Sequence, residues 1–139
     1  MRRSLTITLH WALGLMLVLL LSDAAWNWLT LLFGLCALAM SALALGCGLM
    51  NRPGPALSAG LRLAHPWMHR ALYALLAFIG ALTLYAQLSG SPAPRDLFTW
   101  YLILTAAVLF HAIFHLWRHT ALNDGALRRI TPRSIHKYL

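Results

Sequence analysis

Four long apolar segments cover most of this 139-residue sequence and leave room for little else. About 17 to 25 residues of helix cross a hydrocarbon layer roughly 30 Å thick. The segments predict membrane helices at about 5–22, 29–50, 66–88 and 97–118, followed by a basic tail at 119–139. Residues 1–139 are therefore expected to form a single membrane domain of the all-α class, a four-transmembrane-helix bundle in contact with the lipid bilayer.

Composition excludes the soluble classes of protein. Hydrophobic residues make up 60% of the chain and charged residues only 10%, whereas soluble chains carry about 25% charged residues. The first apolar segment follows Arg2 and Arg3 and so imitates a cleaved signal peptide. Its apolar run is long for a signal and contains His10, so we expect it to remain as the first span.

The basic residues predict how the helices are oriented. All but one of the 11 lysines and arginines fall on one side of the predicted four-span path. These are Arg2, Arg3, Arg52, Arg62, Arg70, Arg118, Arg128, Arg129, Arg133 and Lys137, and only Arg95 falls on the other side. By the positive-inside rule, both termini and the middle loop are expected to be cytoplasmic. The net charge of +8 is then a topology signal with some attraction to anionic lipid, not a nucleic-acid surface.

Acidic residues are scarce, and none falls within a predicted span. Asp23 and Asp96 lie on the predicted outer side, and the sequence contains no Glu. A proton-coupled transporter or a carboxylate-based enzyme is therefore disfavoured.

Histidines are the most informative residues, because ionisable side chains inside a membrane usually have a function. All seven fall on the predicted cytoplasmic side: His10, His65, His69, His111, His115, His119 and His136. His10 and His111 lie on different helices at the same depth, roughly 8 to 10 Å below the surface at about 1.5 Å of rise per residue. Two imidazoles on facing helices of a bundle are what six-coordinate haem iron requires.

Other residues near this depth suit a haem pocket. Gly14 lies one turn beyond His10 and leaves space for a flat ring. His65, His69, His115 and His119 are further candidates for the pocket or the propionates. Arg2, Arg3, Arg62 and Arg70, near the same surface, are candidate partners of the haem propionates.

Two other interpretations of the histidines stay open. A single buried histidine is more often a hydrogen-bonding residue than a ligand. His111, His115 and His119 also form a stripe at a spacing of four, which suits a zinc or copper site on a helix. No carboxylate or thiolate accompanies this stripe, and His115 and His119 can instead hydrogen-bond propionates or lipid headgroups.

Three motifs carry a resemblance to a known family. They are Thr8-Leu9-His10-Trp11 in the first helix, Leu63-Ala64-His65 with His69 and Tyr73 in the third, and His111, His119, Asp124, Gly125, Leu127, Arg129 and Pro132 at the end of the fourth. At these places the chain resembles the bacterial cytochrome b561 family of four-helix b-type cytochromes. The resemblance covers about three quarters of the chain and is loose through the second helix. It implies a multi-pass protein of the bacterial inner membrane, with His10 and His111 as axial ligands of a cytoplasmic-side haem.

The chain also departs from the family pattern. The family's outer haem needs a histidine at the start of the second helix and another at the start of the fourth, and neither 28–32 nor 95–99 contains one. We therefore expect one haem b, carrying one electron at a time and exchanging it with quinone or a partner subunit. Whether the chain is an enzyme is left open, with electron transfer favoured. The alternatives are an accessory subunit of a larger respiratory or photosynthetic complex and, third, a metal-binding protein that uses the histidine stripe.

Overall fold

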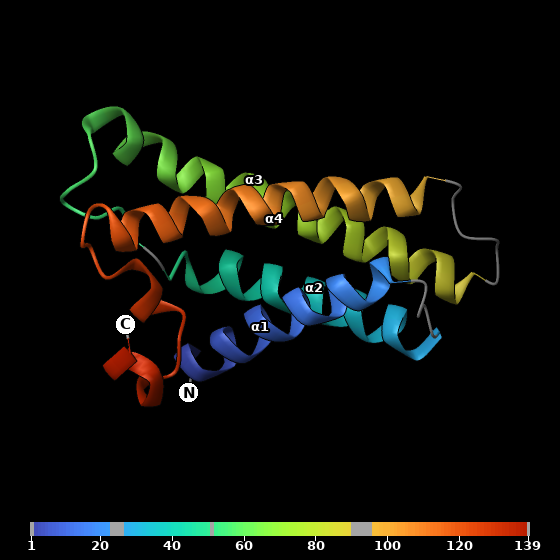
Figure 1. Ribbon diagram of the computed structural model, residues 1–139. Helices are drawn as coiled ribbons and strands as arrows, with labels where there is room; N and C mark the ends of the chain where they lie inside the picture. The colour runs from blue at the N-terminus through green and yellow to red at the C-terminus, as the bar shows by residue number, and fades with distance from the viewer. Residues whose placement is uncertain (1, 23–26, 51, 90–95, 139) are drawn as a thin grey trace.

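Four α-helices run side by side in an elongated bundle (Figure 1). The computed structural model describes residues 2–22, 27–50, 52–89 and 96–138. Its elements are α1 (Arg2–Leu21), α2 (Asn27–Cys47), α3 (Ala59–Leu88) and α4 (Leu97–Thr120), followed by the short 3₁₀ helices η1 (Ala126–Arg129) and η2 (Arg133–Tyr138). The all-α prediction is confirmed.

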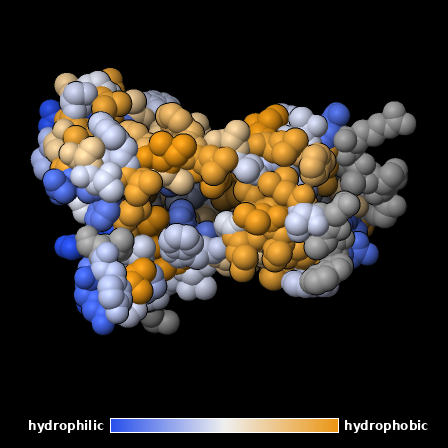
Figure 2. All heavy atoms as spheres, in the orientation of Figure 1, coloured by the Kyte–Doolittle hydropathy of each residue, from blue (hydrophilic) through white to orange (hydrophobic). Residues whose placement is uncertain are grey.

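Each of the four helices is long and apolar enough to cross a membrane. Large apolar side chains point outward along their length, including Leu15, Leu45, Phe110 and Ile113. Figure 2 shows this apolar surface over most of the molecule, with the polar residues gathered mainly at the end that carries the termini. An apolar surface of this extent suits lipid rather than water, so the chain is suggested to be a multi-pass membrane protein.

The helix ends differ from the predicted ones, most of all in α3, which begins at Ala59 rather than at 66. The Ser58 hydroxyl caps it by accepting from the Leu61 N–H at 3.5 Å. Pro66 therefore lies inside the helix, where its missing N–H removes one backbone hydrogen bond. α2 ends at Cys47 instead of 50, because Gly48 adopts a φ of +74°, which a right-handed helix cannot accommodate.

α2 and α3 form the most extensive helix pair in the bundle, and glycines allow their close approach. A Cβ atom added to Gly80 would lie 2.8 Å from the Ala37 Cβ, and one added to Gly34 would lie 3.1 Å from the Gly80 carbonyl oxygen. The first distance is shorter than real Cβ contacts, and the second is tighter than most of them, so this crossing depends on small residues, as membrane helix interfaces commonly do.

The half of the bundle away from the termini is closed by packed side chains. Phe33 and Ile79 are fully buried there, with Leu104 almost so. The Tyr101 ring packs edge-on against Phe33, and its hydroxyl lies 3.0 Å from the Thr83 hydroxyl. This packed half leaves the histidines and most basic residues in the other half.

The segment after α4 folds back on the bundle instead of extending as a separate tail. The Trp11 indole N–H donates to the Ile130 carbonyl at 2.9 Å. Arg3 donates to the carbonyls of Arg128 and Thr131, both at 3.1 Å. The start of α1 and the chain that follows α4 therefore meet at one end of the bundle, where both termini lie (Figure 1).

Candidate functional site

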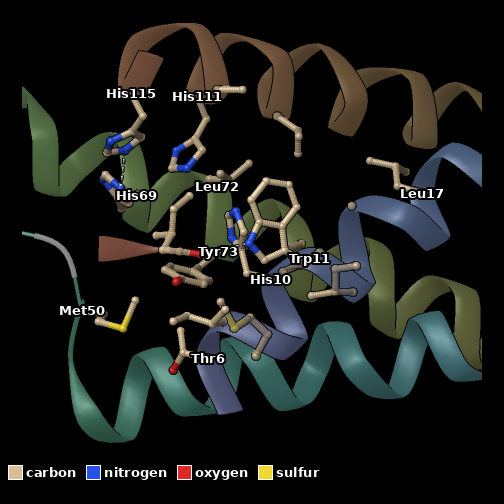
Figure 3. A pocket seen from close by; sticks show the side chains of 18 of the residues that line it. Thr6, His10, Trp11, Leu17, Met50, His69, Leu72, Tyr73, His111 and His115 are labelled. Carbon is tan, nitrogen blue, oxygen red and sulfur yellow. Dashed lines mark hydrogen bonds between the residues drawn. The ribbon is translucent and has the colours of Figure 1, made fainter. Parts of the chain in front are cut away.

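A cavity of about 280 Å³ lies between the helices and is partly open at the surface. Its volume is near the lower end of the range of about 300 to 1,000 Å³ for small-molecule sites. Apolar side chains form most of its wall, and the side chains that carry chemistry come from three helices: His10, Trp11, His69, Tyr73, His111 and His115 (Figure 3). All four histidines in this set are candidate site residues predicted from the sequence, and the fold brings them to one cavity.

His10 of α1 and His111 of α4 face one another across this cavity. Their ring centroids lie 6.2 Å apart, and the ring planes are inclined by 52°. A metal–imidazole bond is about 2 Å long, and the ring centroid lies about 1 Å beyond the nitrogen. Two imidazoles on opposite sides of one metal ion therefore have centroids about 6 Å apart, which is close to the observed separation.

Gly14 lies on the same wall, and the space in front of it is open. A Cβ atom added there would meet no atom within 4 Å outside its own stretch of helix. In contrast, the space in front of Gly34 and Gly80 is occupied by the neighbouring helix. Gly14 therefore contributes to the width of the cavity rather than to helix packing.

His111 has no hydrogen-bond partner for one of its ring nitrogens. Its Nδ1 is buried and unpaired among the described residues. The nearest rings are other histidines, with centroids of His115 at 4.5 Å and of His69 at 5.1 Å. The α4 side of the cavity is thus lined by a cluster of closely spaced imidazoles.

Beyond the cavity, a buried polar network joins α3 to α4. The Arg118 guanidinium is completely buried and donates from Nη1 to the His65 Nε2 at 2.8 Å. It also donates from Nε to Asp124 Oδ2 at 2.7 Å, and its Nη2 lies 2.5 Å from the same oxygen. The only buried arginine among the described residues is therefore neutralised by a carboxylate from the turn after α4.

Gly54 leaves room for this ion pair. A Cβ atom at Gly54 would lie 2.5 Å from Asp124 Oδ2 and 3.1 Å from Arg118 Nη2. The loop between α2 and α3 therefore covers the ion pair with backbone, and a side chain at this position would collide with it.

The predicted propionate partners lie elsewhere. None of Arg2, Arg3, Arg62 and Arg70 is among the described residues that line the cavity. Arg2 donates to the Gly48 carbonyl at 2.6 Å, and Arg3 is held by the carbonyls described above. Arg62 is exposed, and the exposed Arg70 lies 5.0 Å from the centroid of the Trp67 ring. Their pairing with propionates stays a prediction.

The predicted histidine stripe on α4 is divided by the structure. His111 and His115 line the cavity, whereas His119 does not, and its buried Nδ1 has no partner among the described residues. Instead, His115 joins His65 and His69 of α3. The tail histidine, His136, lies in η2 with a ring nitrogen 3.1 Å from the Thr131 carbonyl oxygen.

Sequence reasoning missed the role of Arg118, which it treated only as a topology signal. The available signal was Asp124, the one acid on the basic side of the chain. A lone carboxylate among ten basic residues is placed to form an ion pair, but the sequence alone does not select its partner.

Comparison with protein-family models, with curated protein sequences and with solved structures finds no match for this chain. The resemblance to the cytochrome b561 family is therefore unsupported by these comparisons and rests on the motifs quoted above. The structure supports a protein with four candidate membrane spans and a buried histidine cluster that could hold a metal ion.

Proposed function

We propose that this chain is a membrane b-type cytochrome that holds one haem b between His10 and His111 and carries one electron at a time. The observation that carries the proposal is the pair of rings facing each other across the cavity with centroids 6.2 Å apart. Two imidazoles that together hold one metal ion would lie at about this separation, so His10 and His111 are the residues that would hold the haem iron. His10 and His111 were selected from their depth in the sequence, and the same two residues meet in the fold.

The surrounding residues fit a flat macrocycle. The cavity wall is mainly apolar, and Gly14 keeps open the space one turn above His10. Cofactor sites in helix bundles are built in this way, from side chains on facing helices. The cavity is partly open, so a ring larger than the enclosed volume can extend toward the surface.

Trp11 would orient the His10 ring, and the apolar wall would exclude water. The Trp11 ring packs edge-on against His10 at a centroid distance of 5.7 Å. Trp11 is itself held by its hydrogen bond to the Ile130 carbonyl, so the chain after α4 helps to fix the His10 ring. A bound haem b would supply a one-electron couple, and the apolar wall would keep it in a low-dielectric environment.

The location follows from the charge distribution. With the positive-inside rule, the end that carries the termini faces the cytoplasm, and the resemblance implies the bacterial inner membrane. The distal half is filled by buried side chains that do not line the cavity, such as Ile79 and Tyr101. Electrons would therefore enter and leave at the cytoplasmic half, through quinone in that leaflet or through a partner subunit of a larger membrane complex.

Haem content of the purified full-length protein tests the proposal. A pyridine haemochrome assay in detergent should give about one haem b per chain. His10→Ala and His111→Ala should each abolish the b-type band, and His119→Ala should retain it, because His119 does not line the cavity. Absence of haem from the wild-type protein, or a full band in both ligand variants, overturns the proposal.

Two further measurements separate loss of a ligand from loss of the fold. Adding imidazole to His10→Gly should restore the low-spin spectrum, because free imidazole can replace the missing ring. Gly14→Leu should lose haem and keep its helical circular dichroism, since its Cβ enters open cavity space. Gly46→Leu is the matched control, because Gly46 also has open space but lies away from the cavity.

A further inference from the structure

The outward side of α3 carries an arginine in a stripe that is otherwise apolar. The residues of this stripe are exposed and follow one another at spacings of three and four, so they share one side of the helix: Trp67, Arg70, Ala74 and Phe78. Trp67 and Phe78 keep exposed fractions of 63% and 49%. The stripe lies roughly opposite the buried His65, and none of its residues lines the cavity. An arginine on the lipid side of a membrane helix is costly unless its charge is satisfied.

The length of α3 places the start of this stripe at the membrane surface. Its 30 residues span about 45 Å at about 1.5 Å per residue, whereas the hydrocarbon layer is roughly 30 Å thick. Arg62 and Arg70 both lie in the first half of the helix, and no charged residue follows them in α3. The excess length therefore falls at the start of α3, on the side of the bundle that carries the termini (Figure 1).

Arg70 is oriented toward this surface. Its guanidinium carbon lies 5.0 Å from the centroid of the Trp67 ring, and Trp67 is one turn nearer to the start of the helix. The side chain therefore runs toward the headgroup layer, as long basic side chains near a membrane surface do. Tryptophan is itself enriched at the level of the headgroups, so the guanidinium and the indole meet at the depth of the lipid phosphates.

No acidic side chain among the described residues balances Arg70. The one ion pair in this part of the chain joins Arg118 to Asp124, and Arg70 forms no hydrogen bond with another described residue. Asp96, the other described acid, precedes α4 at the opposite end of the bundle (Figure 1). The counter-charge of this guanidinium is therefore expected from a molecule outside the chain.

An anionic phospholipid has the chemistry that this surface lacks. The guanidinium fork matches two oxygens of a phosphate, and basic residues at a membrane surface attract anionic headgroups. Below Arg70 the same side of α3 continues through Ala74 to Phe78, which gives the acyl chains an apolar path. A water-soluble acidic partner would not use this path.

We propose that Trp67, Arg70, Ala74 and Phe78 form a docking site for one anionic phospholipid. Its phosphate pairs with Arg70 beside the Trp67 ring, and its acyl chains lie along Ala74 and Phe78. The site is on the far side of α3 from the His10–His111 pair and does not depend on the proposed haem.

Native mass spectrometry of the full-length protein in detergent tests the site, with phosphatidylglycerol and phosphatidylcholine of the same acyl chains. The wild-type protein should bind its first phosphatidylglycerol about tenfold more tightly than phosphatidylcholine, the effect of a hydrogen bond to a charged group. Arg70→Gln should lose this preference. Lys137→Gln is the matched control and should keep it, because Lys137 is also exposed and lies 4.7 Å from the centroid of the Tyr138 ring, but in η2.

Four results would each overturn the proposal. They are no preference for phosphatidylglycerol in the wild-type protein, equal loss of preference in Arg70→Gln and Lys137→Gln, displacement of the lipid by excess inorganic phosphate, and a lower haem content in Arg70→Gln than in the wild-type protein. The second would show a diffuse attraction, and the last would assign Arg70 to a haem propionate. The first comparison uses the wild-type protein and needs no haem, so failure of the lipid site and failure of the haem assignment are distinguished.

Discussion

Replacing Asp124 by Asn should destabilise the fold strongly, because it removes the carboxylate that balances the buried guanidinium of Arg118. Arg118 has no exposed surface, and two of its nitrogens lie 2.7 and 2.5 Å from one oxygen of Asp124. Asn keeps the shape of the side chain and one acceptor oxygen. It therefore isolates the loss of charge from the loss of packing.

The expected magnitude follows from burial. Breaking a buried ion pair by removing one partner costs about 3 to 5 kcal/mol, because an uncompensated charge stays behind. At about 1.4 kcal/mol per factor of ten, the unfolding equilibrium constant should rise by two to almost four powers of ten. Arg62→Ala is the matched control, since Arg62 is exposed and exposed substitutions usually change stability by no more than about 0.5 kcal/mol.

The assay is a titration of the detergent-solubilised protein with sodium dodecyl sulfate, followed by helical circular dichroism. A double variant, Arg118→Met with Asp124→Leu, should recover most of the lost stability, because replacing both partners by apolar groups removes the unpaired charge. The reasoning is refuted if the free energies of unfolding of Asp124→Asn and Arg62→Ala differ by less than about 1 kcal/mol, because a difference of about 3 to 5 kcal/mol is expected. It is also refuted if the double variant is less stable than the single one.

Two further predictions concern the same end of the bundle. Gly54→Ala should lower the free energy of unfolding by about 1 to 3 kcal/mol, since its Cβ would lie 2.5 Å from Asp124 Oδ2. Gly60→Ala is the control, because a Cβ there meets open space and should change the unfolding midpoint little. Equal effects of the two substitutions would contradict the predicted collision. Trp11→Phe removes the N–H that donates to the Ile130 carbonyl. It should speed tryptic cleavage between α4 and η2 while the helices unfold at nearly the same detergent concentration, and an unchanged cleavage rate would show that this bond does not hold the segment.

The sequence predicted the helices well because hydropathy over twenty residues is a strong signal, but it placed their ends poorly. The hydropathy pattern predicts a third helix from about residue 66, whereas the cap at Ser58 starts it earlier. The similar depth of His10 and His111 was predictable, because depth along a helix follows directly from residue counting. Each of these inferences depends on one helix at a time.

The polar network could not be predicted in the same way. Arg118 meets Asp124 only because the chain turns through Asn123 and Gly125, with φ values of 51° and 66°. Its other partner, His65, lies on a different helix. Residue counting gives depth but not rotation about the helix axis, and rotation decides that His115 faces His69 while His119 does not line the cavity.

The wall of the cavity has a consequence for the order of assembly. Leu127 and Ile130, which follow all four helices in the chain, line the cavity together with residues of α1. The hydrogen bond from Trp11 joins the first helix to this last segment. A bundle whose four helices have formed would therefore still have an unfinished cavity, and the proposed haem would be held stably only after the segment beyond α4 has folded back.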